Sequence, residues 1–237
     1  AEVEYHDHTS HTIWVRFPID LQSSQARSQY INSVLKDLNE NDIAQLKRYE
    51  RETYSVSDHP ALAGASVVIW TTTPWTIPSN RAIAYSNDVD YGVYEVLAVE
   101  DGSNAKVGEH LIIADKLAEA IFSSAKVSNW SRLEDAKPHH LVCMHPFHEL
   151  EPLWAKQEKK PFSNLIPLLP GDHVTDDAGT GFVHTAPSHG DDDYQLGLKY
   201  GLPMTYNVEP DGSYRKDLPV FGGLAIIQPD GKDGPAN

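Results

Sequence analysis

The apolar residues of this chain fall in many short runs, and most runs end at glycine, proline or polar turn residues. The runs at residues 65–72, 91–99 and 110–114 have the length and composition of β-strands. Two further runs, at 141–147 and 163–169, contain prolines and are expected to be edge strands or kinked ones. The other expected strands lie at residues 11–19 and within 179–187, where a glycine turn precedes the strand.

Helical patterns are fewer. Residues 24–54 place apolar side chains near helical spacing, which predicts one or two amphipathic helices. A helix is expected over 115–125 with Asp115 near its N-terminus, and another over 191–201 that begins with acidic residues and ends at a glycine. Because no alternating strand–helix–strand series occurs, we expect a mixed, β-rich fold, with a β-barrel core and peripheral helices.

Composition narrows the class of protein. The formal charge is −15, so the chain repels nucleic acid at long range, and neither DNA nor RNA is expected as a general partner. No apolar run reaches the roughly 20 residues that a membrane-spanning helix needs. A single cysteine, Cys143, cannot form an intrachain disulfide, and we expect a cytoplasmic location. The sequence starts with Ala1 and ends in a Gly/Pro-rich stretch, so we expect one domain, residues 1–237, cut from a longer chain.

The stretch "WTTTPWTIPSN", residues 70–80, turns from an apolar strand into three hydroxyls and a proline. Threonine favours strands and Pro74 stops hydrogen bonding, so this can be an ordinary strand end. Alternatively, Thr71, Thr72 and Thr73 line a polar pocket, because hydroxyls bind a ribose, a carbonyl group or a water molecule. Trp75 would then form an apolar wall.

The second polar cluster is "GTGFVHTAPSHGDDDY", residues 179–194. Gly179 and Gly181 permit a positive φ or a close approach of the backbone. His184 and His189 flank a proline turn, and the acids 191–193 begin a predicted helix. These acids can simply complement the helix dipole, or one of them can bind an ammonium group in a pocket.

A third cluster contains the metal-ligand types His and Cys. Its members are His139, His140, Cys143, His145 and His148. They are crowded and lack a second distant pair, so a structural zinc site stays a minor alternative, and neither a metal nor a cofactor is expected. The histidines at positions 6, 8 and 11 are expected to be solvated.

The two motifs together closely resemble the inserted editing domain of isoleucyl-tRNA synthetase, a class I aminoacyl-tRNA synthetase. The resemblance covers roughly residues 60–220 and the first strand. Leucyl and valyl relatives carry Arg-Pro where this chain has Thr73-Pro74-Trp75, which favours the isoleucyl family. The motifs H-I-G-H and K-M-S-K-S are absent, so amino-acid activation is not expected here. Residues 21–60 and 151–164 look like family-variable insertions, and Asp191 stands where the family often has proline.

The resemblance implies a hydrolytic, proofreading function: removal of valine wrongly attached to isoleucine tRNA. Isoleucine and valine differ by one methylene, and a hydrophobic pocket separates them by only about 1–3 kcal/mol, a general estimate for which this same synthetase is the usual example. The expected partners are the valine-carrying 3′ terminal adenosine of that tRNA and the rest of the synthetase chain. A module that binds aminoacyl-adenosine without turnover is the alternative.

The resemblance also implies roles for single residues. Asp193 would hold the α-ammonium group of the substrate, and His184 would help to set the size limit. Asn80 would support the threonine peptide, and water rather than a side chain would attack the ester. The implied catalytic residues are Thr71, Thr72, Thr73 and Asp193, and the implied substrate-binding residues are Trp75, Asn80, Gly181, His184 and His189.

Overall fold

The structure is a computed structural model that describes residues 11–20, 58–150, 164–228 and 230–236. The helices expected over 24–54, and nearly all of the two expected insertions, 21–60 and 151–164, lie outside the described residues. Among the described residues, no helix has the length and apolar character to cross a membrane.

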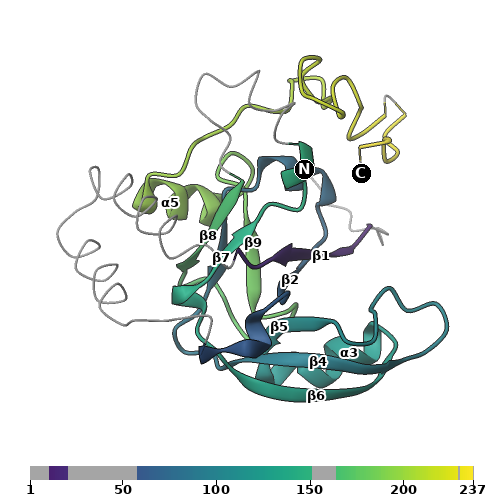
Figure 1. Cartoon of the computed structure of the whole chain (residues 1–237). Coiled ribbons are helices and arrows are strands. Elements are labelled where there is room, and N and C mark those ends of the chain that lie inside the picture. The colour runs from purple at the N-terminus through teal and green to yellow at the C-terminus, as the bar shows by residue number, and fades with distance from the viewer. Residues whose placement is uncertain (1–10, 21–57, 151–163, 229, 237) are drawn as a thin grey trace, which may run out of the picture.

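A five-stranded sheet forms the lower half of the molecule in Figure 1. The strands run in the order β1-β2-β5-β4-β6, and all neighbours are antiparallel except the parallel pair β2–β5. Their bounds are Ile13–Pro18 for β1, Ser66–Thr71 for β2, Tyr91–Val99 for β4, His110–Ala114 for β5 and Val127–Ala136 for β6.

A second sheet has four strands in the order β7-β8-β3-β9. It contains β3 (Ala82–Tyr85), β7 (Val142–Met144), β8 (Leu165–Pro170) and β9 (Phe182–Thr185). β7 is the last strand in the order of this sheet, although its Cys143 also forms an isolated antiparallel bridge with Ile19. β8 is not an edge strand, because it pairs with β7 on one side and with β3 on the other. The prolines of β8 are therefore accommodated inside a sheet.

Two strands were not expected from the sequence. β3 has only four residues, all of them buried, directly after the threonine-rich peptide. β6 is mostly polar and exposed, so its apolar pattern is weak, and shifts in register interrupt its long pairing with β4. The mixed, β-rich fold is confirmed, although the described strands form two sheets rather than one closed barrel.

Within the described part of the chain, one α-helix covers the outer face of each sheet. α3 (Ala118–Ser124) follows the short 3-10 helix η5 (Asp115–Leu117) and packs on the five-stranded sheet, as Figure 1 shows. α5 (Asp191–Tyr200) packs on the four-stranded sheet and ends at Gly201 in the left-handed conformation, as predicted. The other described 3-10 helices are η3 (Pro60–Leu62), η4 (Pro74–Ser79), η6 (Pro138–His140) and η7 (His148–Leu150).

Asp115 lies in the first turn of η5, near the start of the expected helix, but its side chain makes no capping hydrogen bond there. Instead, its carboxylate accepts hydrogen bonds from Arg132 on β6 and from the Tyr94 hydroxyl on β4, at 2.8 Å and 2.6 Å. These charge-assisted bonds tie the end of β5 to its neighbour β4 and to β6, the next strand in the sheet.

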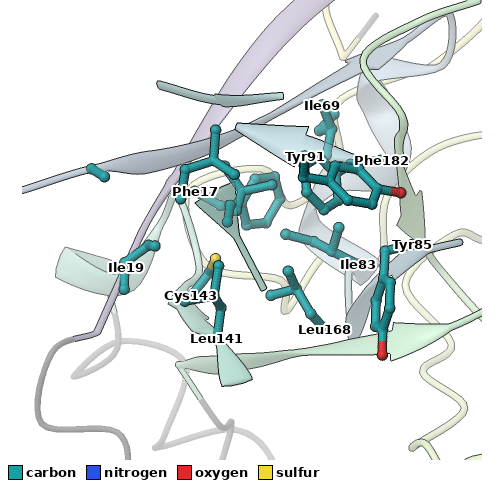
Figure 2. Close-up of a cluster of buried hydrophobic side chains, with 14 of the residues drawn as sticks. Phe17, Ile19, Ile69, Ile83, Tyr85, Tyr91, Leu141, Cys143, Leu168 and Phe182 are labelled. Atoms are coloured by element: carbon teal, nitrogen blue, oxygen red, sulfur yellow. The ribbon is translucent and has the colours of Figure 1, made fainter. Parts of the chain in front are cut away.

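The main core lies between the two sheets (Figure 2). Phe17 and Ile69 reach it from the five-stranded sheet, and Ile83 from the four-stranded one. The rings of Tyr91 and Phe182 lie 4.4 Å apart, and the Tyr91 hydroxyl donates to the Gly181 carbonyl at 2.7 Å. These contacts fix β9, the strand that carries the second motif, against the larger sheet.

Candidate active site

The two polar motifs meet because their strands pair directly. η4 contains most of the threonine-rich peptide and leads into β3. β3 pairs antiparallel with β9, so that Ile83 lies opposite His184. The end of β2, the 3-10 helix η4 and the start of α5 therefore surround one end of β9, although the motifs are about a hundred residues apart in sequence.

A pocket of about 220 Å³ opens at this junction. It is lined by Trp70, Thr71, Thr73, Thr76, Val183, His184, His189, Gly190 and Asp193. Five of the nine site residues expected from the sequence therefore share one pocket, and four of them lie outside its lining.

The four outside residues differ in what they contact. Thr72 is exposed and lies one residue beyond the end of β2. Trp75 is half-buried and packs edge-to-face on His189, with ring centroids 5.1 Å apart. Gly181 has the expected positive φ of 79°, but it faces Ala114, where a Cβ would approach within 2.4 Å of the alanine Cβ. Asn80 is fully buried behind the pocket.

Hydrogen bonds hold the threonine peptide in one conformation. The Thr73 N–H donates to the Thr71 hydroxyl oxygen at 3.1 Å, and the two hydroxyls lie 3.2 Å apart. The Thr76 hydroxyl donates to the Thr73 carbonyl at 2.8 Å. The proton of Thr76 is thus committed, whereas the hydroxyls of Thr71 and Thr73 line the pocket and can also bind a ligand.

His184 is held by hydrogen bonds at both ring nitrogens. The Asn80 side-chain amide donates to Nδ1 at 2.7 Å, and Nε2 lies 2.7 Å from the Thr76 hydroxyl. Because Nδ1 accepts, Nε2 carries the proton and donates to Thr76. Burial lowers the pKa of His184 to about 3, so the ring is neutral near pH 7. A neutral ring with both nitrogens engaged is a rigid wall rather than a base.

Asp193 contributes a carboxylate to the pocket. Its Oδ2 accepts a hydrogen bond from the Ala186 N–H at 2.8 Å, and Oδ1 accepts none from the described residues. Burial raises the pKa of this carboxyl group, because a charged group loses solvation there. A cationic ligand would restore the lost interaction. Its neighbours Asp191 and Asp192 are exposed at the start of α5.

Sequence reasoning missed Thr76, which lines the pocket and contacts His184. A signal for it exists, because residues at i and i+3 share one side of a 3-10 helix, and a proline after three threonines can begin one. Trp70, Val183 and Gly190 were also missed as lining residues. They belong to the two motifs, but no feature of their chemistry distinguishes them.

The third cluster is embedded in the fold. Cys143 is fully buried in the main core, and burial raises the pKa of its thiol. His145 donates from Nε2 to the Ile77 carbonyl at 3.1 Å and accepts the Phe147 N–H at Nδ1. Among the described residues, no group of three or more His, Cys, Asp or Glu side chains could hold a metal ion.

The sequence of this chain is similar to part of the isoleucine–tRNA ligases of several bacteria. The whole chain aligns with isoleucine–tRNA ligase of Caulobacter vibrioides at 43% identity and with that of Bradyrhizobium diazoefficiens at 37%. This chain is homologous to a segment of isoleucine–tRNA ligase. The resemblance expected from the motifs is confirmed, and the chain spans about a fifth of the length of these relatives, 21% in each case.

Family profiles and solved structures add little to this homology. No protein-family profile matches the chain. The solved structures similar to it include the editing domain of the cytosolic leucyl-tRNA synthetase of P. knowlesi, with a TM-score of 0.46, 14% identity, and coverage of 82% of this chain and 68% of that one. A LeuRS CP1 structure has a TM-score of 0.44 and 16% identity, covering 78% and 57%.

The stability of this chain is expected to fall on acidification. Burial lowers the pKa values of His145 and His184 from 6.5 to about 3, so between these pH values the unfolded chain binds protons that the folded chain does not. Each histidine should then lower the free energy of unfolding by on the order of 2 kcal/mol at pH 5 relative to pH 7.

Urea unfolding at the two pH values measures this loss of stability. His145→Gln, which keeps a donor near Ile77, should make the pH dependence shallower; an unchanged dependence contradicts this assignment.

Proposed function

We propose that this segment hydrolyses the ester that joins valine to the 3′ terminal adenosine of isoleucine tRNA. The observation that carries the proposal is the pocket itself. In a homologue of isoleucine–tRNA ligase, it combines an unpaired carboxylate oxygen, two available hydroxyls and neutral imidazoles. A free amino acid would bring a carboxylate to this pocket, whereas an aminoacyl ester brings an ammonium group and no second negative charge.

Asp193 supports the recognition of an α-amino group. Asp193 lines the pocket, and its Oδ1 accepts no hydrogen bond from the described residues. Burial has raised the pKa of the carboxyl, which an ammonium partner at hydrogen-bond distance would lower again. The resulting charge-assisted bond is stronger than a neutral one. It would position the ester carbonyl next to the hydroxyls of Thr71 and Thr73.

The small volume and rigid wall of the pocket support a limit on side-chain size. His184 is only 7% exposed and cannot turn aside without breaking its bonds to Asn80 and Thr76. A side chain that carries one more methylene than valine would meet this ring. The segment would therefore clear the smaller amino acid and spare isoleucine, which adds to the modest selectivity of a single hydrophobic pocket.

The chemistry supported by these side chains is attack by water. Nδ1 of His184 accepts a hydrogen bond already, and the described lining residues include no serine or cysteine paired with a base. Preorganised hydroxyls can orient a water molecule and polarise the carbonyl without forming a covalent intermediate. With a formal charge of −15, the segment would hold the 3′ end alone and rely on the rest of the synthetase for most phosphate contacts.

Deacylation of charged tRNA tests this function. An excess of the segment is mixed with isoleucine tRNA that carries radiolabelled valine, so that weak affinity does not hide turnover. Release of free valine, with isoleucine tRNA charged with isoleucine left intact, is the expected result. Saturable binding of valyl-adenosine with no release of valine would instead identify a binding module without hydrolytic activity.

The threonine hydroxyls give a prediction within this function. Thr71→Val and Thr73→Val keep the β-branched outline but remove a pocket hydroxyl, and each should slow valine release by an order of magnitude or more. Thr72→Val, at an exposed position outside the lining, should have the smallest effect of the three. Single-turnover rates and melting temperatures measure both consequences. If Thr72→Val is the slowest variant, the exposed hydroxyl meets the substrate outside the pocket.

A further inference from the structure

His189 is hydrogen-bonded to Ser79, which in turn is hydrogen-bonded to Asn207. The proposed function gives these two buried side chains no role. Nε2 of His189 lies 3.1 Å from the hydroxyl oxygen of Ser79, the last residue of η4. The side-chain amide of Asn207, in the segment after α5, donates to the same hydroxyl oxygen at 3.0 Å. Ser79 is 1% exposed and Asn207 is 2% exposed, so water does not compete for these bonds.

The donor and the acceptor in each of these two hydrogen bonds follow from counting the protons available to the three side chains. The Asn207 amide nitrogen is only a donor, so the Ser79 oxygen accepts from it. The Ser79 hydroxyl then has one acceptor among the described residues, Nε2 of His189, and a buried hydroxyl that donates nowhere would be costly. Nε2 therefore accepts, and the proton of the neutral ring is on Nδ1.

This is the opposite tautomer from that of His184. In His184 the ring N–H is used by Thr76, whereas Nδ1 of His189 has no hydrogen-bond partner among the described residues. His189 lines the pocket with Asp193 and the threonines. Of the two imidazoles in the lining, only His189 therefore offers a free N–H to a ligand.

We infer that His189 donates a hydrogen bond from Nδ1–H to the carbonyl oxygen of the bound ester, and that Ser79 and Asn207 are positioning residues that set its tautomer. The inference rests on the proposed function. Negative charge develops on the carbonyl oxygen during hydrolysis, and a donor already aimed at that oxygen stabilises the transition state more than the ground state. The bonds from Asn207 to Ser79 to Nε2 point in one direction and polarise one another, which strengthens the final donor.

The step balances as an ordinary ester hydrolysis. The oxygen of water forms a bond to the carbonyl carbon, and the π electrons move onto the carbonyl oxygen, where Nδ1–H of His189 stabilises them. Collapse breaks the bond between that carbon and the ribose oxygen, which takes one proton of the water. The products are a valine carboxylate, a ribose hydroxyl and one released proton. His189 itself neither gains nor loses a proton, which agrees with a ring kept neutral because burial lowers its pKa.

The tautomer can be measured without any substrate. In the 237-residue chain labelled with ¹⁵N at histidine, the nitrogen shifts of His189 should show a protonated Nδ1 and an unprotonated Nε2. Asn207→Asp provides a carboxylate that accepts the Ser79 proton, so the ring should change to the Nε2–H form. Ser79→Ala removes the partner of Nε2 and should give a mixture of both forms. An Nε2–H ring in the unaltered chain overturns the inference.

Kinetics then test the donor itself. His189→Asn can place an amide N–H near the position of Nδ1, whereas His189→Gln places it near Nε2. In single-turnover deacylation, His189→Gln and His189→Ala should lower the maximal rate about a hundredfold with little change in half-saturation, and His189→Asn should recover much of it. Equal losses in the Asn and Gln variants overturn the donor role. Absence of valine release from the unaltered chain would contradict the proposed function, and the tautomer measurement would still stand by itself.

Discussion

Asp193→Ala is expected to abolish the release of valine from charged tRNA while the chain stays folded. The substitution removes the one carboxylate in the described pocket lining, so the substrate ammonium group would be buried without a counter-charge. Removing one partner of such a pair costs roughly 2–5 kcal/mol, which corresponds to a rate loss of tens to thousands of times. Single-turnover deacylation at saturating enzyme concentration measures the loss.

Two further substitutions separate charge from shape. Asp193→Asn keeps an oxygen that can accept the Ala186 N–H and removes only the charge, so it should lose activity almost as fully while retaining its melting temperature. Asp192→Ala removes an exposed neighbour of the same charge and should leave the rate unchanged. Full activity in Asp193→Ala combined with loss in Asp192→Ala would move the ammonium site by one residue.

His184→Ala is expected to change what the pocket accepts. The ring is fixed between Asn80 and Thr76, and its removal opens space where the extra methylene of isoleucine would fit. The variant should release isoleucine from correctly charged tRNA, which the unaltered chain spares. It should also lose on the order of 2 kcal/mol of stability, because a buried side chain is replaced by a cavity.

His184→Gln is the matched control for this size limit. It keeps much of the bulk of histidine and a donor that can reach Thr76, so it should still spare isoleucine. Both charged tRNAs are compared for both variants at a temperature well below their melting points. If His184→Ala loses activity on valine and continues to spare isoleucine, His184 positions the substrate or the Thr76 hydroxyl and does not set the size limit.

The sequence allowed the strands with strong apolar runs to be predicted, and β4 and β5 agree with the expected bounds residue for residue. It did not allow prediction of β3, which is too short to show a period, or of β6, which is mostly polar and has half of its side chains exposed. The arrangement of β8 inside a sheet also could not be predicted, because a parallel neighbour far away in sequence leaves no local pattern.

The candidate site was predictable only in part, because the sequence shows the residue types but not the direction of their side chains. Chemistry-bearing residues such as Asp193 and His184 stand out by type, and five of the expected residues line one pocket. Side-chain direction was not predictable: Thr72 lies outside a pocket lining that includes Thr71 and Thr73, and the Asn80 amide bonds to His184. The role of Ser79 depends on Asn207, 128 residues later, and no local pattern connects two such positions.

This wide separation has a consequence for the order in which the molecule acquires its pocket. Asn80 and His184 are 104 positions apart, and Ser79 and Asn207 are 128 apart, so the contacts that close the site across β9 span nearly half of the chain or more. Such contacts form only after a large loss of chain entropy and tend to form late in folding. During synthesis, a chain that has not yet reached β9 has the threonines but no opposing wall. The candidate pocket would therefore be among the last parts to mature, after the larger sheet has already folded.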